Sequence, residues 1–463
     1  MRPLALTDIA AWCRADLRGG QASDCIDAIA IDTRALDASD GRKVLFVALK
    51  GENHDAHDHL SAAIAGGAAA LLVARAVDAP IPQLQCADTG QALGDLAAGV
   101  QRGRPATVLA LTGSNGKTSV KTLLLGICER AGRAYANPGN RNNEVGLPLA
   151  VLAAPEDAQY AIYEMGAGKP GDIAWLTAVV RPDVALVNNV MPAHLERMGS
   201  LLGVAQTKGA IYQALPADGA AVINADDAFA PYFESLAGGR RVLRFGLEAS
   251  AEITARKVVL HDDSSGFELV TPHGSADIAL PLPGRHNVRN ALAAAAMALA
   301  AGIALDAVRE GLCHARPVPG RQIAHTLPNG AVLIDDSYNA NPGSVEAAIA
   351  ALAATAGQAW LVLGDMAELG DGSPALHAQV GASARARKIA RLYAVGPLSR
   401  ATATAFGSDA RHFEDRDALI AALRHDLRPG VRVLVKGSRA SAMDGVVAAL
   451  LADAGIAKEH AHA

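Results

Sequence analysis

Short apolar runs recur along the chain, and segments with apolar residues at helical spacing separate them. In the middle of the chain such runs occupy residues 108–111, 160–163, 184–187 and 220–223. Each run has the length of a buried strand, and helical stretches separate the first three. Because alternating strands and helices are typical of a parallel sheet wrapped by helices, we expect such a sheet here.

The same alternation extends toward both ends of the chain. On the N-terminal side we expect helices over 6–13 and 62–70, and strands over 29–31, 44–49 and 69–73. On the C-terminal side we expect strands over 332–334, 359–363, 392–395 and 431–435, and fraying over 459–463. One stretch differs: residues 253–279 have an antiparallel pattern with a turn at 262–266, and an alanine-rich helix over 291–301 follows.

The sequence TGSNGKTS lies between the run at 108–111 and the helical segment that follows it. Glycine at two positions lets the backbone turn tightly, so that its N–H groups can point at a polyphosphate. The positive end of the following helix also favours anions. We therefore expect a nucleotide site in which Lys117 reaches the outer phosphates and Thr118 lies on Mg²⁺. The predicted loop residues are Gly113, Ser114, Asn115, Gly116, Lys117, Thr118 and Ser119.

This loop is shorter than the common Walker sequence G-x-x-x-x-G-K-[ST]. The residue five positions before Gly116 is Leu111, where that sequence has glycine. An NTPase switch or motor would have the longer loop and an aspartate at the end of its second strand, whereas here the second run ends at Glu164. The short loop therefore favours another class of ATP-using enzyme.

Two features divide the chain into domains. With 463 residues, 51% of them hydrophobic, it exceeds what one core supports. A basic segment at 101–105 and the sequence Pro-Val-Pro-Gly at 317–320 have the composition of hinges. We predict an α/β protein of three domains: a smaller N-terminal α/β domain (1–103), a central P-loop-type parallel sheet wrapped by helices (104–316), and a doubly wound, Rossmann-like C-terminal domain (317–463).

Polar residues at the predicted carboxyl ends of the central strands are candidates for chemistry, because ligands gather there in parallel sheets. Glu164 follows the second run, and His194 lies downstream of the third. With a phosphate oxygen they would form a Mg²⁺ environment, although histidine is an unusual magnesium ligand and is more often a satisfied polar residue. Lys208 either extends to water or, near metal ions, loses its proton and reacts with CO₂ to form a carbamate; the sequence leaves both open.

Several further polar clusters have both a functional and a structural interpretation. Thr33, Arg34 and His57 would bind an anionic ligand or belong to solvated loops. Asn287 and Asn290, one helical turn apart, would cap a helix or offer amides to a nucleobase. Clusters at 335–342, 364–370 and 436–439 follow predicted strands of the C-terminal domain, and we interpret them as a substrate face.

Charge and composition exclude several classes of protein. The formal net charge is −5 and no strongly basic block is present, so we do not expect a nucleic-acid partner. The cysteines lack CxxC spacing and are expected to be reduced thiols. Neither a signal peptide nor an apolar run long enough for a membrane span is expected, which favours a cytoplasmic location.

Several motifs taken together resemble those of the ATP-dependent Mur ligases of peptidoglycan synthesis. The phosphate loop TGSNGKT is also found in folylpolyglutamate synthases and therefore indicates only the superfamily. The motifs GNRNNEVGLP, EMGAGKPGDI, NNVMPAHLERMGS, DDSYNANP and GDMAELG are narrower. DDSYNANP with GDMAELG resembles the members that add D-alanyl-D-alanine to UDP-N-acetylmuramoyl-tripeptide, and no DNPR-type motif of the diaminopimelate- or lysine-adding relatives is present.

The resemblance implies a role for each candidate residue. Lys117, Glu164, His194 and Lys208 match the catalytic positions, and Thr118, Glu164, His194 and carbamylated Lys208 match the ligands of Mg²⁺, with two ions expected. Asn287, Asn290, Arg321 and Asp336 match residues that hold the adenine, phosphates and ribose of ATP. The remaining matches are to substrate positions: Thr33, Arg34 and His57 for the UDP moiety, Asn142 and Asn143 for a substrate-side loop, and Ser337, Tyr338, Asn339 and Asn341 for the acceptor dipeptide.

The implied reaction passes through an acyl phosphate on the tripeptide carboxylate, which the amine of D-alanyl-D-alanine attacks. The resemblance also implies a monomer. The rival interpretations are a sister Mur ligase, a folylpolyglutamate synthase, which lacks the N-terminal domain, and a non-catalytic nucleotide-binding module. The last would leave the polar clusters at the strand ends without a purpose.

Overall fold

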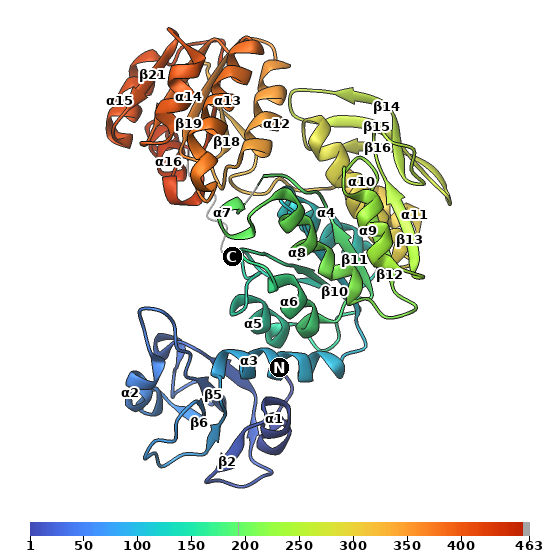
Figure 1. Cartoon of the computed structure of the whole chain (residues 1–463), viewed down its shortest axis with the longest axis vertical. Helices are drawn as coiled ribbons and strands as arrows, with labels where there is room; N and C mark the ends of the chain where they lie inside the picture. Colours follow the sequence, from blue (N-terminus) through green and yellow to red (C-terminus); the bar gives the residue numbers. More distant parts are fainter. Residues whose placement is uncertain (193, 457–463) are drawn as a thin grey trace.

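Figure 1 shows the computed structural model of the chain, which describes residues 1–192 and 194–456. Its helices and strands form three groups along the sequence, each built on one large sheet. The predicted α/β class and the central parallel sheet are confirmed. The expectation for residues 459–463 lies outside the described residues.

The central sheet contains the four predicted strands and two more. Its order is β13-β12-β11-β8-β10-β9, and all neighbours are parallel. The strands are β8 (Thr107–Thr112), β9 (Ala134–Ala136), β10 (Tyr160–Glu164), β11 (Val184–Val187), β12 (Ala220–Asn224) and β13 (Arg241–Phe245). Since the chain leaves β8 toward one side and later returns to its other side, the sheet has a switch point at β8, where ligands gather in such folds.

Helices cover both faces of the central sheet, as the period-2 alternation of its strands requires. Leu109 and Leu111 of β8 pack toward α4 (Lys117–Ala131), α10 (Arg285–Ala300) and α11 (Leu305–Cys313). Val108 and Ala110 pack toward the opposite face. That face is covered by α5 (Gly146–Ala153), α6 (Asp172–Val180), α8 (Leu201–Gln213) and α9 (Ala230–Ala237).

Helices α4 and α11 approach closely because Gly311 has no side chain. A Cβ at Gly311 would lie 2.5 Å from the Cα of Ile127 and 2.7 Å from its nitrogen. Gly311→Ala is therefore expected to lower the free energy of unfolding by about 1–3 kcal/mol, because backbone must shift to admit the methyl group. Denaturant unfolding measures this. Gly239→Ala, which has open space around its Cβ, is the control, and an equal loss in both variants would contradict the packing argument.

The stretch predicted as antiparallel forms a small sheet of β14 (Thr254–Leu260), β15 (Ser265–Thr271) and β16 (Gly274–Leu280). The alanine-rich helix that follows, α10, begins at Arg285, earlier than predicted. Its buried alanines pack against α4 and the sheet, so the small side chains allow close helix packing on both sides.

The N-terminal group has a five-stranded sheet in the order β2-β7-β6-β5-β4. Its strands are β2 (Asp16–Arg18), β4 (Ala28–Ala30), β5 (Val44–Val47), β6 (Ala68–Val73) and β7 (Gln83–Gln85), beside the small pair β1 (Leu4–Ala5) and β3 (Cys25–Ile26). Helix α1 (Leu6–Cys13) is where the pattern predicts it. The helix predicted over 62–70 is wrong at its C-terminal end: α2 (Leu60–Ala65) stops before two glycines, and Gly67 has a φ of 97° that a helix cannot accommodate.

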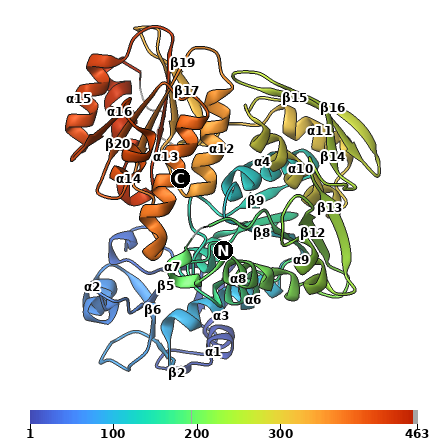
Figure 2. The same cartoon turned by 45° about the horizontal axis from the view of Figure 1, so that its top comes forward.

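Helix α3 (Thr89–Arg102), which the pattern did not predict, joins the N-terminal and central groups. Gly99 of α3 lies against Trp12, and Gly94 lies against Trp175 of α6. The core on this side therefore continues from one sheet to the other through α3. Figures 1 and 2 both show α3 between the two groups.

The C-terminal sheet has the order β17-β18-β22-β19-β20-β21, in which only β17 is antiparallel to its neighbour. Helices on both faces make this group doubly wound. The strands are β17 (Ile323–Thr326), β18 (Val332–Asp336), β19 (Gln358–Gly364), β20 (Arg391–Val395), β21 (Ala410–Phe413) and β22 (Val431–Lys436). The helices are α12 (Pro342–Ala353), α13 (Ser373–Ala386), α14 (Ser399–Phe406), α15 (Arg416–Asp426) and α16 (Asp444–Asp453).

The division into domains at 103–104 and 316–317 remains our proposal, and the arrangement of elements supports it. The first position lies between α3 and β8, and the second lies between α11 and β17. In the part of the chain that the structure describes, no helix combines the length and apolarity needed to cross a membrane.

Candidate active site

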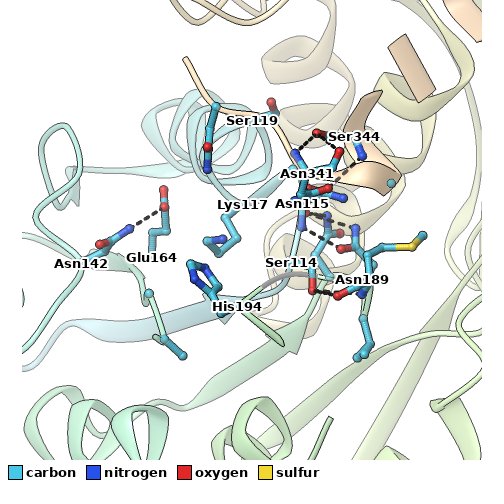
Figure 3. Close-up of a pocket in the computed structure, with 18 of the residues that line it drawn as sticks. Ser114, Asn115, Lys117, Ser119, Asn142, Glu164, Asn189, His194, Asn341 and Ser344 are labelled. Carbon is cyan, nitrogen blue, oxygen red and sulfur yellow. Dashed lines mark hydrogen bonds between the residues drawn. The ribbon is translucent and has the colours of Figure 1, made fainter. Parts of the chain in front are cut away.

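A cavity of about 1650 Å³ opens at the carboxyl ends of the central strands and extends to the C-terminal domain. Lys117, Glu164 and His194 line it from the central domain, and Tyr338 and Asn341 line it from the C-terminal domain. Pockets for one small ligand usually measure about 300–1,000 Å³, so this cavity has room for more than one. Figure 3 shows the side chains of Lys117, Glu164 and His194 around a common space.

The predicted phosphate loop connects β8 to the first turn of α4, which begins at Lys117. Gly116 has a φ of 76°, and a Cβ there would lie 2.5 Å from Oδ1 of Asn290 and 2.7 Å from Nδ2 of Asn188. Glycine is therefore required at this position for both conformation and space. The N-terminus of α4 faces the cavity with no side-chain cap, which leaves its backbone N–H groups available for an anion.

Asparagine side chains hold this loop from three directions. The N–H of Asn115 donates to Oδ1 of Asn189 at 2.8 Å, and the side-chain amides of Asn188 and Asn189 donate to the carbonyl of Asn115 at 2.9 and 3.1 Å. Nδ2 of Asn341, from the C-terminal domain, donates to Oδ1 of Asn115 at 2.7 Å. The loop is thus tied to the residues that follow β11 and to the N-cap of α12 (Figure 3), so one of its contacts comes from the C-terminal domain.

Two lysine ammonium groups share one carbonyl beneath the loop. Nζ of Lys117 donates to the carbonyl of Gly113 at 2.8 Å, and Nζ of Lys208, on α8, donates to the same oxygen at 3.1 Å. Lys208 is buried, and burial together with the charge of Lys117 holds its pKa well below the usual value. Burial also lowers the pKa of Lys117, although Glu164 opposes that shift. Two lysine side chains at a helix N-terminus form a site for a polyanion.

Glu164 ends β10 with its carboxylate buried among cations. Its Oε1 accepts from Nδ2 of Asn142 at 2.9 Å, and its Oε2 lies 3.4 Å from Nζ of Lys121 without accepting a hydrogen bond. Burial alone would raise the pKa of this carboxyl, but Lys121, Lys117 and Arg321 outweigh it, so the pKa is lowered. The side chain is therefore an ionised carboxylate with one oxygen free for a further cation.

His194 connects the central and C-terminal domains. Its Nδ1 lies 2.5 Å from Oε2 of Glu368, and both residues have positive φ angles, of 54° and 61°. Burial lowers the pKa of His194, while Glu368 acts in the opposite direction. Within the described residues no group of three or more histidine, cysteine or acidic side chains is arranged to hold a metal ion. A metal at this site would therefore need oxygen atoms from a ligand or from a modified side chain in addition to Glu164.

Arg321, which directly follows the predicted hinge at 317–320, also connects the domains. Its Nη2 donates to the hydroxyl of Thr118 at 2.9 Å, and its guanidinium lies 4.5 Å from the ring centre of Tyr338. At the end of β18, Asp336 accepts from Nζ of Lys436 at 2.8 Å. Burial raises the pKa of Asp336, and Lys436 acts against that shift. The C-terminal domain thus contributes a guanidinium that contacts Thr118 and a carboxylate that lines the cavity.

Asn287 and Asn290 lie inside the first turns of α10 and do not cap it, so the capping interpretation is wrong. Gly284 is the N-cap, and the helix has no side-chain cap. Nδ2 of Asn287 donates to the carbonyl of Pro283 at 2.8 Å, and Nδ2 of Asn290 donates to Oδ1 of Asn287 at 3.3 Å. Both residues line the cavity beside the phosphate loop.

Comparison with known proteins agrees with this geometry. The Mur ligase middle domain matches residues 111–298, and the Mur ligase, glutamate ligase domain matches residues 321–439. The UDP-N-acetylmuramoyl-tripeptide–D-alanyl-D-alanine ligase of Escherichia coli is 46% identical over 448 residues, which cover 96% of this chain and 97% of that one. The chain belongs to the Mur ligase family.

Solved structures support the same assignment. A crystal structure of MurF from Acinetobacter baumannii has a TM-score of 0.92 and 32% sequence identity, covering 98% of this chain and 99% of that one. A crystal structure of MurF from Thermotoga maritima in complex with ADP has a TM-score of 0.82 and 26% identity, covering 92% of this chain and 98% of that one. The similarity to these two structures covers 98% and 92% of this Mur ligase, so it extends over nearly the whole chain.

The structure brings most of the predicted residues of this Mur ligase to the cavity and places others around it. Two of them do not line the cavity themselves. Thr118 accepts a hydrogen bond from Arg321, which lines the cavity, and Lys208 donates to the carbonyl of Gly113 in the loop. Ser337 is turned away, since its hydroxyl donates to Oδ1 of Asp335 at 2.5 Å and the residue is buried. The predicted residues that line the cavity are Ser114, Asn115, Gly116, Lys117, Ser119, Asn142, Asn143, Glu164, His194, Asn287, Asn290, Arg321, Asp336, Tyr338, Asn339 and Asn341.

Thr33, Arg34 and His57 lie on the N-terminal domain and do not line the cavity. The Arg34 side chain is 89% exposed and pairs with Asp32, so it is accessible to an anion. His57 is buried: its Nε2 accepts from the N–H of Ala74 at 2.9 Å, so the ring proton is on Nδ1 and is donated to Asp55 at 2.6 Å. Any contribution of His57 to binding therefore acts through the loop that it fixes.

Sequence reasoning missed three residues that line or support the cavity, and it gave Lys436 only as a member of the cluster at 436–439. Lys121 and Lys436 each hold a carboxylate, and Gln91 joins Trp175 across the interface of the N-terminal and central domains at 2.8 Å. Lys121 had a local signal, because it lies four residues after Lys117 and so on the same helix face. The pair of Gln91 and Trp175 had none, since the two residues are far apart in sequence.

Proposed function

We propose that this Mur ligase joins D-alanyl-D-alanine to the terminal carboxylate of UDP-N-acetylmuramoyl-tripeptide and uses ATP to do so. The observation that carries the proposal is the pair of lysines on the Gly113 carbonyl, which forms an anion site at the N-terminus of α4. Similarity to D-alanyl-D-alanine-adding relatives along 96% of the chain supports the choice of substrates.

ATP binds with its phosphates on the loop. Lys117 and the N-terminal N–H groups of α4 face the β- and γ-phosphates. Asn287 and Asn290 face the adenine side from α10, and Asp336 faces the ribose. Arg321 lies over the loop from the C-terminal domain and stabilises negative charge as the γ-phosphoryl group moves. These assignments of individual residues are part of the proposal.

The residues present fit the Mg²⁺ ions that accompany ATP. Oε2 of Glu164 is a buried carboxylate oxygen without a hydrogen bond, which is the kind of atom that Mg²⁺ coordinates. Thr118 adds a hydroxyl, and His194 lies at the rim of the same space. Bound magnesium supplies charge neutralisation between ATP and the substrate carboxylate.

Lys208 would complete this set as a carbamate. Its depressed pKa favours the neutral amine, whose nitrogen attacks CO₂ to form an N–C bond with release of one proton. The product is an anion beside the ammonium group of Lys117. This change would turn Lys208 from an amine that shares an acceptor with Lys117 into a charged partner for it and an oxygen ligand for a metal.

The reaction then takes two steps. A carboxylate oxygen of the tripeptide attacks the γ-phosphorus, the bond to ADP breaks, and an acyl phosphate forms. The amine of D-alanyl-D-alanine attacks the carbonyl carbon, and the tetrahedral intermediate loses phosphate and a proton to give the amide. Contacts between Arg321, Asn341 and the phosphate loop hold the C-terminal domain over the cavity, which helps exclude water from the acyl phosphate.

The other substrates extend from this centre in two directions. Tyr338, Asn339 and Asn341 face the cavity from the C-terminal domain, on the side proposed for D-alanyl-D-alanine. Asn142 and Asn143 face the tripeptide, and Thr33 and Arg34 face the uridine diphosphate. We further propose that the enzyme acts as a monomer in the cytoplasm, where ATP and nucleotide-linked precursors are available.

Isotope transfer tests the reaction. With UDP-N-acetylmuramoyl-tripeptide labelled with ¹⁸O in its terminal carboxylate, ATP and D-alanyl-D-alanine, one ¹⁸O atom is expected in the released phosphate. The amide product is expected to retain the other atom. Mass spectrometry of phosphate and product measures both. Unlabelled phosphate released together with the amide would contradict activation through an acyl phosphate.

A further inference from the structure

Lys121 lies one helical turn after Lys117 on α4, and its ammonium group contacts three oxygen atoms. Nζ donates to the carbonyl of Asn137 at 2.8 Å and to the carbonyl of Gly139 at 3.0 Å. It lies 3.4 Å from Oε2 of Glu164, and its side chain is 7% exposed. Two of the three ammonium donors therefore have carbonyl acceptors, and the ammonium group forms an ion pair with Oε2 of Glu164 without a hydrogen bond to it.

The loop that Lys121 binds is the same loop that holds Glu164. The side chain of Asn137 pairs with the backbone of Glu164 on both sides: Oδ1 accepts from its N–H at 2.8 Å, and Nδ2 donates to its carbonyl at 3.1 Å. Five residues further on, Asn142 donates to Oε1 of Glu164 at 2.9 Å. Backbone and carboxylate of Glu164 are thus fixed by one loop, and that loop is anchored on Lys121.

The contacts leave a particular part of Glu164 free. Oε1 is occupied by Asn142, whereas Oε2 faces the ammonium of Lys121 at a distance longer than a good hydrogen bond. Lys121 therefore supplies charge to this oxygen without occupying its lone pairs by a short hydrogen bond. A simple anchor for the loop would need only the two carbonyl contacts.

We propose that Lys121 is a positioning residue for Glu164. Lys121 orients the free carboxylate oxygen of Glu164 toward the metal of ATP, and it fixes the substrate-side loop 137–143 relative to that carboxylate. The inference rests on the proposed function in treating Glu164 as the carboxylate that faces magnesium. Lys121 itself touches neither the nucleotide nor the metal. Residues that orient metal ligands typically change metal affinity or activity by about 10- to 100-fold when they are replaced.

The test compares nucleotide binding with and without Mg²⁺ by calorimetry, using ADP as the probe. In Lys121→Met we expect the Kd for ADP alone to stay close to that of the wild type. The factor by which Mg²⁺ lowers this Kd is expected to fall about 10-fold or more. The same loss is expected in Glu164→Gln. In the double variant the two losses are expected not to add, because Lys121 acts through Glu164.

Controls separate the proposal from a loss of structure. Lys43→Met removes an exposed lysine just before β5 that does not line the cavity, and it is expected to bind ADP and Mg²⁺ as the wild type does. If Lys121→Met does not fold, Lys121→Gln retains an amide donor for the loop, lacks the charge, and is expected to show the same loss. In the folded variants, phosphate release is expected to show a lower kcat and a higher requirement for Mg²⁺, with little change in the KM for D-alanyl-D-alanine.

Three results would overturn the inference or the function beneath it. Full strengthening by Mg²⁺ in a folded variant of Lys121 would overturn the positioning role. Additive losses in the double variant would show that Lys121 acts independently of Glu164 and would also overturn it. If the wild type itself binds ADP equally with and without Mg²⁺, the proposed metal site fails, and this outcome is distinct from the other two.

Discussion

Replacing Lys117 with alanine is expected to reduce phosphate release by about 10³-fold or more, because the variant loses the ammonium group that faces the transferring phosphoryl group. The fold is expected to remain intact. Lys117 and Lys208 share one carbonyl acceptor, and the charge of Lys117 lowers the pKa of Lys208, so removal of Lys117 relieves an unfavourable interaction in the unliganded protein. The measurement is phosphate release with all substrates at saturation, together with thermal unfolding of the unliganded variant.

Lys169→Ala is not a suitable control for this variant, because Lys169 lines the cavity. Lys388→Ala is suitable, since this lysine is exposed in the C-terminal domain. Its phosphate release is expected to match that of the wild type. Turnover near the wild-type rate in folded Lys117→Ala would remove the phosphate loop from the mechanism.

Lys208→Met is expected to lower phosphate release by about 10²-fold or more, because the variant can neither form the carbamate nor provide its oxygens for a metal. The wild type is expected to lose activity in buffer depleted of CO₂ and to regain it when bicarbonate is added. After incubation with ¹³C-bicarbonate, a carbamate resonance is expected in the wild type and not in the variant. Phosphate release and ¹³C NMR measure these effects.

The effect of pH on Lys208 has a definite sign. Its pKa is lowered in the folded protein, so between the folded and unfolded pKa values the unfolded chain binds more protons at this site. The buried lysine therefore costs stability below its unfolded pKa, and Lys208→Met is expected to unfold at a higher temperature than the unliganded, uncarbamylated wild type. Equal bicarbonate dependence in the wild type and the variant would contradict carbamylation of Lys208.

The sequence predicted the central sheet well because its strands are buried on both faces. Uninterrupted apolar runs such as those at 108–111 and 184–187 are typical of parallel strands that helices cover on both sides. The edge strands β9 and β13 were missed because their residues are partly exposed and do not form such runs. Helix α3 was missed although it is largely buried, because Gly94 and Gly99 are not typical of a helix interior. Their place in the helix is explained by close packing against Trp175 and Trp12, which belong to other elements.

The candidate site shows the same division between local and long-range information. The phosphate loop could be predicted because its chemistry lies within one strand, one turn and one helix. The contacts of Asn115 with Asn341 and of Thr118 with Arg321 could not, since each joins two domains across more than 200 residues. Sequence patterns carry no signal for the side-chain geometry of such pairs, and only the folded arrangement shows them.

The most direct test of the proposed function is phosphate release from ATP with UDP-N-acetylmuramoyl-tripeptide and a panel of acceptors. The panel contains D-alanyl-D-alanine, diaminopimelate, lysine and glutamate. We expect phosphate release that depends on D-alanyl-D-alanine and on no other acceptor, with one phosphate formed for each amide. Release with a single amino acid and not with the dipeptide would contradict the assignment of the C-terminal domain to D-alanyl-D-alanine.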